Sequence, residues 1–189
     1  MDVYLHVRVL LSMILGLGVA HLLRGVARIV QHPKKTKIYW VHLVWALFLF
    51  LYLIHFWWWE FSLQKVERWT FPLYFFIALY AILLYLLCSL LFADDMQDYE
   101  GYRDYFYSRR RWIFTLMAIL FVADIIDTVI KGSAYRAKLG LTYDIRTAIY
   151  ILLSILAIKI RSPRFHAAFA VFAVTVEVFY ILKLYLTIG

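Results

Sequence analysis

The feature that most constrains this chain is a series of long apolar runs that carry almost no charge. The run from Phe71 to Ala93, for example, contains no Asp, Glu, Lys or Arg. A helix needs about 20 apolar residues to cross roughly 30 Å of hydrocarbon, and such runs recur along the sequence. A barrel strand would instead alternate between apolar and polar residues over about ten positions. We therefore expect an all-α polytopic integral membrane protein.

We predict six transmembrane helices, separated by short polar connections. Of the 189 residues, 65% are hydrophobic and only 17% are charged, against about 25% charged in an ordinary soluble domain. No stretch is left over for a soluble domain, so residues 1–189 are expected to form a single membrane domain. The predicted spans are Val3–Val30, Ile38–Leu63, Thr70–Ala93, Trp112–Ile130, Asp144–Ile160 and Phe165–Ile188.

The distribution of basic residues predicts the orientation in the membrane. The net charge of +8 would suggest nucleic-acid binding in a soluble protein, but here Lys and Arg lie mostly beside span ends, so no nucleic acid is expected. Cytoplasmic loops are enriched in Lys and Arg, and the first hairpin turn, HPKKTK at 32–37, is short and strongly basic. We expect both termini outside, in a cell (inner) membrane.

The longest polar connection, residues 94–111, separates two halves of three spans, 3–93 and 112–188. The segments VAHLLRGV at 19–26 and VADIIDTV at 122–129 align, with ionisable residues at matching positions. A duplication with an odd number of spans per half would give inverted three-helix repeats, as in many transporters. The linker is expected to be cytoplasmic, either as a surface helix or as a solvated loop. Its basic run, Arg109, Arg110 and Arg111, is a candidate site for an anionic lipid or a protein partner.

Two pairs of ionisable residues lie within apolar spans. His21 and Arg24 belong to the first span, where Arg24 can extend towards the headgroups but His21 is too short and needs a partner within the bundle. Asp124 and Asp127 share one face of the fourth span. The predicted orientation puts the two pairs at opposite depths, so they should not touch. We expect the aspartates to pair with Arg8, His55 or Lys131, and Arg24 with Asp94 or Asp95.

Small residues on the first span, Ser12, Gly16 and Ala20, recur every four positions and predict close helix contact. Glu177 lies near the middle of the last span. A charged residue there costs roughly 2.5–3.5 kcal/mol on insertion scales, so its carboxyl is expected to be protonated, paired or facing water. Glu177 could serve transport, or it could hold helices together through a hydrogen bond to Tyr80, Tyr85 or Ser89.

These residues favour a small channel or transporter for an ion or small polar solute, proton-linked through Glu177 and assembled as a homo-oligomer. The polar interior would comprise Glu177, His21, Arg24, Asp124, Asp127 and His55. The alternative is a non-transporting scaffold or accessory subunit that binds a partner protein or anionic lipid. A third hypothesis is a haem redox protein, since His6, His21, His42 and His55 could pair at similar depths on two antiparallel helices. No catalytic or metal-binding motif is present in the sequence, so an enzyme is not the expected class.

Overall fold

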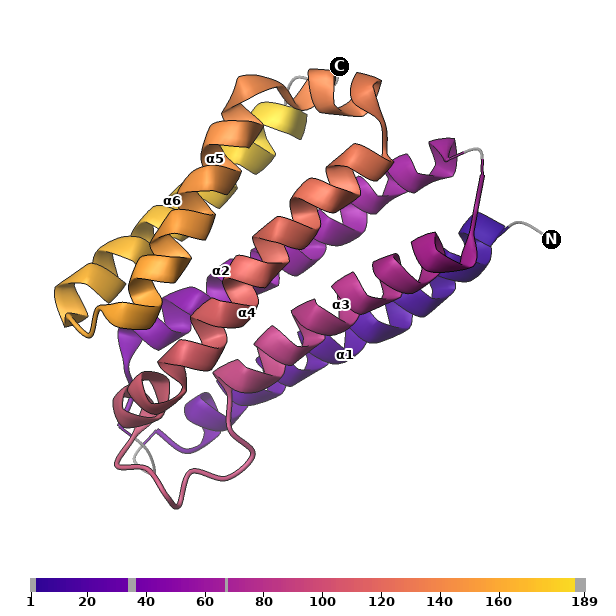
Figure 1. Cartoon of the computed structure of the whole chain (residues 1–189). Coiled ribbons are helices and arrows are strands. Elements are labelled where there is room, and N and C mark those ends of the chain that lie inside the picture. Colours follow the sequence, from indigo (N-terminus) through magenta and orange to yellow (C-terminus); the bar gives the residue numbers. More distant parts are fainter. Residues whose placement is uncertain (1–2, 34–36, 67, 186–189) are drawn as a thin grey trace.

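The computed structural model describes residues 3–33, 37–66 and 68–185, and the described residues form an all-helical bundle (Figure 1). Six of its helices are long and apolar enough to span a membrane, which confirms the predicted all-helical class and the predicted number of long apolar helices. Lys34 and Lys35 of the basic turn lie outside the described residues. The elements are α1 (Val3–Gln31), α2 (Trp40–Trp59), the short 3-10 helix η1 (Glu60–Lys65), α3 (Phe71–Leu91), α4 (Tyr102–Ile130), α5 (Ser133–Lys159) and α6 (Pro163–Tyr185).

Consecutive helices run antiparallel, so the bundle has two distinct ends (Figure 1). At one, which we call the terminal end, α1 begins, α6 ends, and the α2–α3 and α4–α5 connections lie. At the other, the basic end, lie the α1–α2, α3–α4 and α5–α6 connections. The basic residues near this end include Arg28, Arg103, Arg109, Arg110, Arg111, Lys159, Arg161 and Arg164.

Helix α2 is the centre of the bundle. It packs against α1, α3, α4 and α6, and a larger share of it is buried than of any other apolar helix. Its fully buried side chains are mostly aromatic, with Trp45, Phe48, Tyr52 and Phe56 following one another along the helix. Large rings bury much area per side chain and pack edge to face, so α2 can fix several neighbours at once.

Helix α4 begins ten residues earlier than its predicted span, because residues 102–111 continue the helix. This corrects the picture of residues 94–111 as a separate surface helix or loop; only the segment before Tyr102 is irregular. The start of α4 is fixed by a close backbone approach. The Tyr102 N–H donates to the Lys37 carbonyl at 3.0 Å, and a Cβ on Gly101 would lie 2.8 Å from Lys37 Cβ.

The small-residue stripe on α1 does not face the bundle as expected. Ser12, Gly16 and Ala20 are exposed, whereas Gly18 and Gly25 are buried. Gly25 lies against the Phe92 ring so closely that even a methyl group at this position would overlap it. Close contact between α1 and its neighbours therefore depends on Gly18 and Gly25, one helical face away from the predicted stripe.

The packing of the two three-helix halves differs. In the first half α1 packs along α3, whereas the corresponding pair, α4 and α6, meets mainly through rings near the basic end, where Phe114 stacks on His166 at 5.3 Å and on Phe169 at 5.8 Å. The major contacts between halves are α3 with α4 and α2 with α6. The aligned segments at 19–26 and 122–129 thus lie in different packing environments, and the inverted repeat stays a prediction.

Candidate functional site

The bundle buries a set of charged side chains that come from five different elements. We call this set the charged cluster: His55, Glu60, Asp124, Asp127, Lys131, Arg146 and Glu177. Helices α2, α4, α5 and α6 and the 3-10 helix η1 each contribute, and Lys131 directly follows α4. Charges in an apolar interior are stable only when paired or hydrogen-bonded. The geometry of the pairing therefore decides what the cluster can do.

Glu177 joins α6 to two other helices. Its carboxylate is 0% exposed and accepts hydrogen bonds from His55 Nδ1 of α2 at 2.6 Å and from Arg146 Nη1 of α5 at 3.1 Å. The predicted need for a partner is met, but not by Tyr80, Tyr85 or Ser89. The Arg146–Glu177 ion pair joins α5 to α6, as does the Tyr150 hydroxyl, which donates to the Ala173 carbonyl at 2.9 Å.

Arg146 extends the pairing to α4. Its Nη2 atom lies 3.8 Å from Asp124 Oδ2, and its guanidinium lies over the Tyr180 ring, 4.1 Å from the centroid. Asp124 also accepts a hydrogen bond from the Tyr80 hydroxyl at 3.3 Å, and Tyr80 contacts Tyr52 at 3.2 Å. A continuous chain of polar contacts thus runs from His55 through Glu177 and Arg146 to Asp124 and two tyrosines.

A second group within the cluster centres on Lys131. Its ammonium donates to Asp127 Oδ2 at 2.5 Å and to Glu60 Oε1 at 2.9 Å, and Glu60 Oε1 also accepts from Trp59 Nε1 at 2.8 Å. Burial alone would lower the pKa of the Lys131 amine, but the charges of Glu60 and Asp127 outweigh burial and raise this pKa. Lys131 therefore stays protonated at neutral pH.

Carboxyl groups outnumber the side chains with a fixed positive charge in the cluster. Four carboxyl groups face only two side chains that carry a fixed positive charge, Lys131 and Arg146. Among the described residues, Asp127 Oδ1 and Glu60 Oε2 are buried and accept no hydrogen bond. Burying an acceptor without a donor costs about 1–3 kcal/mol, and more when it is charged. The cluster is therefore built with unused capacity to accept protons or hydrogen-bond donors.

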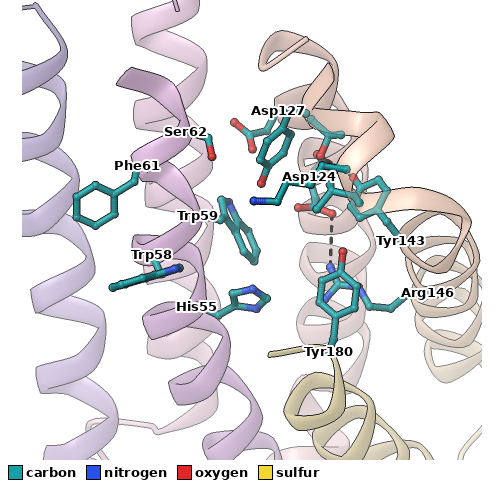
Figure 2. A pocket seen from close by; sticks show the side chains of 14 residues that line it. His55, Trp58, Trp59, Phe61, Ser62, Asp124, Asp127, Tyr143, Arg146 and Tyr180 are labelled. Atoms are coloured by element: carbon teal, nitrogen blue, oxygen red, sulfur yellow. Dashed lines mark hydrogen bonds and ion pairs between the residues drawn. The ribbon is translucent and has the colours of Figure 1, made fainter. Parts of the chain in front are cut away.

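A cavity of about 300 Å³ lies beside the cluster towards the terminal end (Figure 2). In Figure 2, His55 and Trp59 of α2 lie across the cavity from Asp124 and Arg146. Glu177 does not line the cavity, but both of its hydrogen-bond partners do. The lining residues are His55, Trp58, Trp59, Phe61, Ser62, Asp124, Asp127, Thr128, Tyr135, Lys138, Leu139, Tyr143, Arg146 and Tyr180.

The first turns of α5 form one wall of this cavity. Gly140 interrupts α5 with φ 65° and ψ −175°, and Gly132 precedes the helix with φ 94°. Both angles belong to backbone regions that favour glycine. Residues 133–139 therefore form a short helical arm between two glycines, and this arm supplies Tyr135, Lys138 and Leu139 to the cavity.

The bundle between the cluster and the basic end is filled by rings, which we call the aromatic plug: Trp45, Phe48, Phe114, Phe121, Tyr150 and Phe169. Trp45 packs edge-on against Phe114 and Phe169, with centroids 5.4 and 4.9 Å apart. The Phe121 and Tyr150 rings stack at 4.5 Å. All six side chains are at most 2% exposed, so tightly packed rings lie between this cavity and the basic end, where a separate pocket of about 290 Å³ is lined by polar residues that include Arg28, Asp95 and Glu100.

The six residues predicted for a polar interior fall into two groups. Glu177, Asp124, Asp127 and His55 belong to the charged cluster. His21 and Arg24 do not, because they lie towards the basic end: His21 Nε2 donates to the Phe92 carbonyl at 3.1 Å and Arg24 is exposed. The two predicted pairs are indeed apart.

Several predicted partners differ from those observed. Arg8 lies over the Phe61 ring at 4.3 Å and not beside an aspartate. Arg28, rather than Arg24, reaches the irregular segment, where it donates to the carbonyls of Ala93 and Asp94. Lys131 is the partner of Asp127, as predicted, whereas His55 binds Glu177 and not an aspartate.

The histidines do not form the haem arrangement. His6 is exposed, His55 is bonded to Glu177, and His42 Nε2 donates to the Leu91 carbonyl at 2.5 Å. Among the described residues, no group of three or more His, Cys, Asp or Glu side chains could hold a metal ion.

Sequence reasoning missed Arg146 and Glu60 as members of the site. Arg146 is a cation within an apolar run, so intramembrane charge alone was a signal for it. Glu60 follows the aromatic segment HFWWW close to the end of the predicted Ile38–Leu63 span, where a charged residue at the border of a membrane is common. Comparison with family models, curated proteins and solved structures finds no match for this chain. The class that fold and site define is thus a six-helix bundle, suited by length and composition to a membrane, with a polar cavity at one end.

Proposed function

We propose that this protein is an integral membrane carrier that moves an ion or small polar solute, with proton transfer through the His55–Glu177 pair. The observation that carries the proposal is the cavity at the terminal end, whose wall includes His55 and Arg146, the two partners of Glu177. A scaffold gains nothing from a charged cavity in an apolar bundle, since well-packed apolar residues stabilise as well as buried ion pairs do.

The aromatic plug favours a carrier over an open channel. A channel needs a continuous polar path, whereas a carrier exposes its site to one side at a time. Here the polar path stops at the stacked rings of Phe121 and Tyr150. The chain from His55 to Glu177, Arg146 and Asp124 links four of the helices, α2, α6, α5 and α4, whose relative movement would open the other side.

The bilayer is the partner best supported by the surface. Large apolar side chains are exposed on outer faces of the bundle, among them Leu17, Leu152 and Phe179. This surface suits lipid and would promote aggregation in water. We propose insertion in the cell (inner) membrane, with the terminal end outside and the basic end inside. Arg109 and Arg111 are exposed at the basic end, where they could meet anionic lipid headgroups, while Arg110 is buried and donates to the Ile158 carbonyl.

Homo-oligomer formation is supported by the outward-facing stripe of Ser12, Gly16 and Ala20 on α1, which leaves room for a second helix. The inverted repeat adds no support, since the two halves pack differently. The proposed mechanism does not depend on it.

Liposome flux measurements test the proposal. Glu177→Gln keeps the size and hydrogen-bonding capacity of the side chain but removes its charge and its titration. We expect this variant to fold, and to lose either solute or proton flux or the pH dependence of flux. Flux and a pH profile equal to those of the wild type would remove Glu177 from the mechanism.

The matched control is Asp144→Asn, which neutralises a carboxylate that is paired with Arg136 at 3.1 Å on the outside of α5. Flux should be unchanged in this variant. If the wild-type protein moves no solute across a broad panel of ions, amines, organic acids and sugars, the scaffold hypothesis replaces the carrier.

A further inference from the structure

We infer that the ligand of the terminal-end cavity is a small organic ammonium ion, a protonated primary amine. This inference rests on the proposed function, because it names the class of solute that the carrier would bind. Three observations support it: the charge of the cluster, the hydrogen-bond acceptors that it leaves unused, and the aromatic composition of the cavity wall.

The charge of the site selects a cation. Asp124 and Asp127 line the cavity and belong to a cluster in which four carboxyl groups face two fixed cations. An anion placed there would be repelled by each ionised carboxylate in a low-dielectric region, where unscreened repulsion is strong. Lys138, on the arm of α5, is an exposed cation on the cavity wall.

The unused acceptors select a cation that carries N–H groups. Asp127 lines the cavity but is only 1% exposed. Its Oδ1 atom is buried and accepts no hydrogen bond from any described residue. The other oxygen of the same carboxylate already binds an ammonium group, that of Lys131, at 2.5 Å. The site therefore already accommodates one ammonium–carboxylate contact. A ligand amine would donate a hydrogen bond to the second oxygen, Asp127 Oδ1. A quaternary ammonium, which has no N–H, could not.

The cavity walls suit the organic part of such a ligand. Trp58, Trp59, Tyr135, Tyr143 and Tyr180 contribute rings to the wall. Such rings attract cations by their quadrupole, and here they already hold two cations of the protein: Lys131 Nζ lies 5.4 Å from the Tyr135 centroid, and Arg146 lies 4.1 Å from that of Tyr180. A volume of about 300 Å³ is at the small end of ligand-binding cavities and limits the amine to a short chain or a single ring.

Equilibrium dialysis of the detergent-solubilised full-length protein with radiolabelled propylammonium and benzylammonium tests the inference. We expect saturable binding of at least one amine, displaced by the other. Three unlabelled competitors of similar size should each displace it at least 10-fold less well: propan-1-ol, which is neutral, propionate, which is an anion, and tetramethylammonium, which is a cation without N–H. Competition by propionate or propan-1-ol equal to that of the amines overturns the inference, as does the absence of saturable amine binding.

Two variants and one control variant test whether the amine binds in this cavity. Asp127→Asn should weaken amine binding about 10- to 100-fold, because a hydrogen bond to a charged group is lost. Asp144→Asn, the exposed carboxylate on the same helix bundle, should bind as the wild type does. Since Asp127→Asn also removes a partner of Lys131 and could impair folding, Lys138→Gln provides an independent test on an exposed side chain. Loss of this repelling charge should strengthen amine binding about 2- to 3-fold at low salt, and less at high salt. Weaker binding in Lys138→Gln contradicts the inference.

The outcome separates this inference from the proposed function. Amine binding without flux in liposomes would leave the ligand class standing and remove the carrier. Flux of an anion or a neutral solute that amines do not inhibit would keep the carrier and overturn the ligand class.

Discussion

At the scale of single residues, the protein places seven ionisable side chains where an apolar bundle would be expected to have none. Each of the two fixed cations bridges two carboxylates: Lys131 joins Asp127 to Glu60, and Arg146 joins Asp124 to Glu177. A cation that bridges two anions costs more to remove than one in a single pair, because two buried carboxylates then lose their counter-charge. The cluster is therefore sensitive to the loss of either cation.

Replacement of Lys131 by methionine tests this at constant side-chain size. We expect Lys131→Met to lower the free energy of unfolding by about 3–5 kcal/mol, the usual cost of breaking a buried ion pair from one side. Addition of Asp127→Asn should recover part of the loss, since one uncompensated charge is removed. Unfolding in mixed detergent at neutral pH provides the measurement. Lys138→Met, which changes an exposed lysine nearby, should alter stability by less than about 0.5 kcal/mol, and an equal effect of both lysines would contradict the bridging role.

The sequence predicted which residues would need partners better than it predicted the partners. Glu177 and His55 were both recognised, but nothing in the sequence indicated that they meet across 122 positions. Contacts of this kind depend on how each helix is rotated about its own axis. Rotation is set by the packing of the whole bundle, as the small-residue stripe on α1 illustrates: it was expected to give close helix contact, but Ser12, Gly16 and Ala20 are exposed.

At the scale of elements, the arm 133–139 of α5 is the part of the site whose position depends most on backbone conformation. It carries Tyr135 and Lys138 to the cavity and is bounded by Gly132 and Gly140, which both have positive φ. The predicted fifth span began only at Asp144, because the arm is polar and its glycine breaks the apolar pattern. Polar, glycine-bounded segments lie below the length and hydrophobicity that mark a span, so the apolar pattern could not reveal this wall of the cavity.

Substitution of alanine for Gly140 tests the conformational requirement. A Cβ at this position would meet nothing within 4 Å, so any cost of Gly140→Ala comes from its φ of +65°. We expect a loss of about 1–2 kcal/mol in stability, together with a change in the reactivity of a cysteine placed at Lys138. Gly16→Ala is the matched control, since Gly16 also has open space around it but lies within the regular part of α1. That change should be neutral or stabilising by up to about 1 kcal/mol. Equal effects at both glycines would indicate that the backbone of the arm is not constrained.

At the scale of the whole molecule, the sequence predicted the number of helices and the separation of the ionisable residues, but not how the two halves pack. The number of helices followed from the apolar runs, because the length of each run is sufficient evidence for one helix. The relation between the two halves could not be obtained in this way, since apolar segments align easily whatever their packing. The separation of His21 and Arg24 from Asp124 and Asp127 did follow from the sequence. In a bundle of antiparallel helices, the position of a residue along its helix fixes which end of the bundle it is nearer.

The orientation of the bundle is the last property that can be tested, and it decides from which side a solute reaches the cavity. Because basic connections are retained in the cytoplasm, the end that carries Arg103, Arg109 and Arg111 should face inwards and the cavity outwards. A cysteine at Gln97, exposed in the α3–α4 connection, should react with a membrane-impermeant maleimide only after the cells are opened. A cysteine at Ser62, on the cavity wall, should react in intact cells and be protected by a bound solute. The native Cys88 is buried and should stay unlabelled in both conditions, which makes the wild-type protein the control. Labelling of Gln97→Cys in intact cells would reverse the orientation, and the cavity would then take up its solute from the cytoplasm.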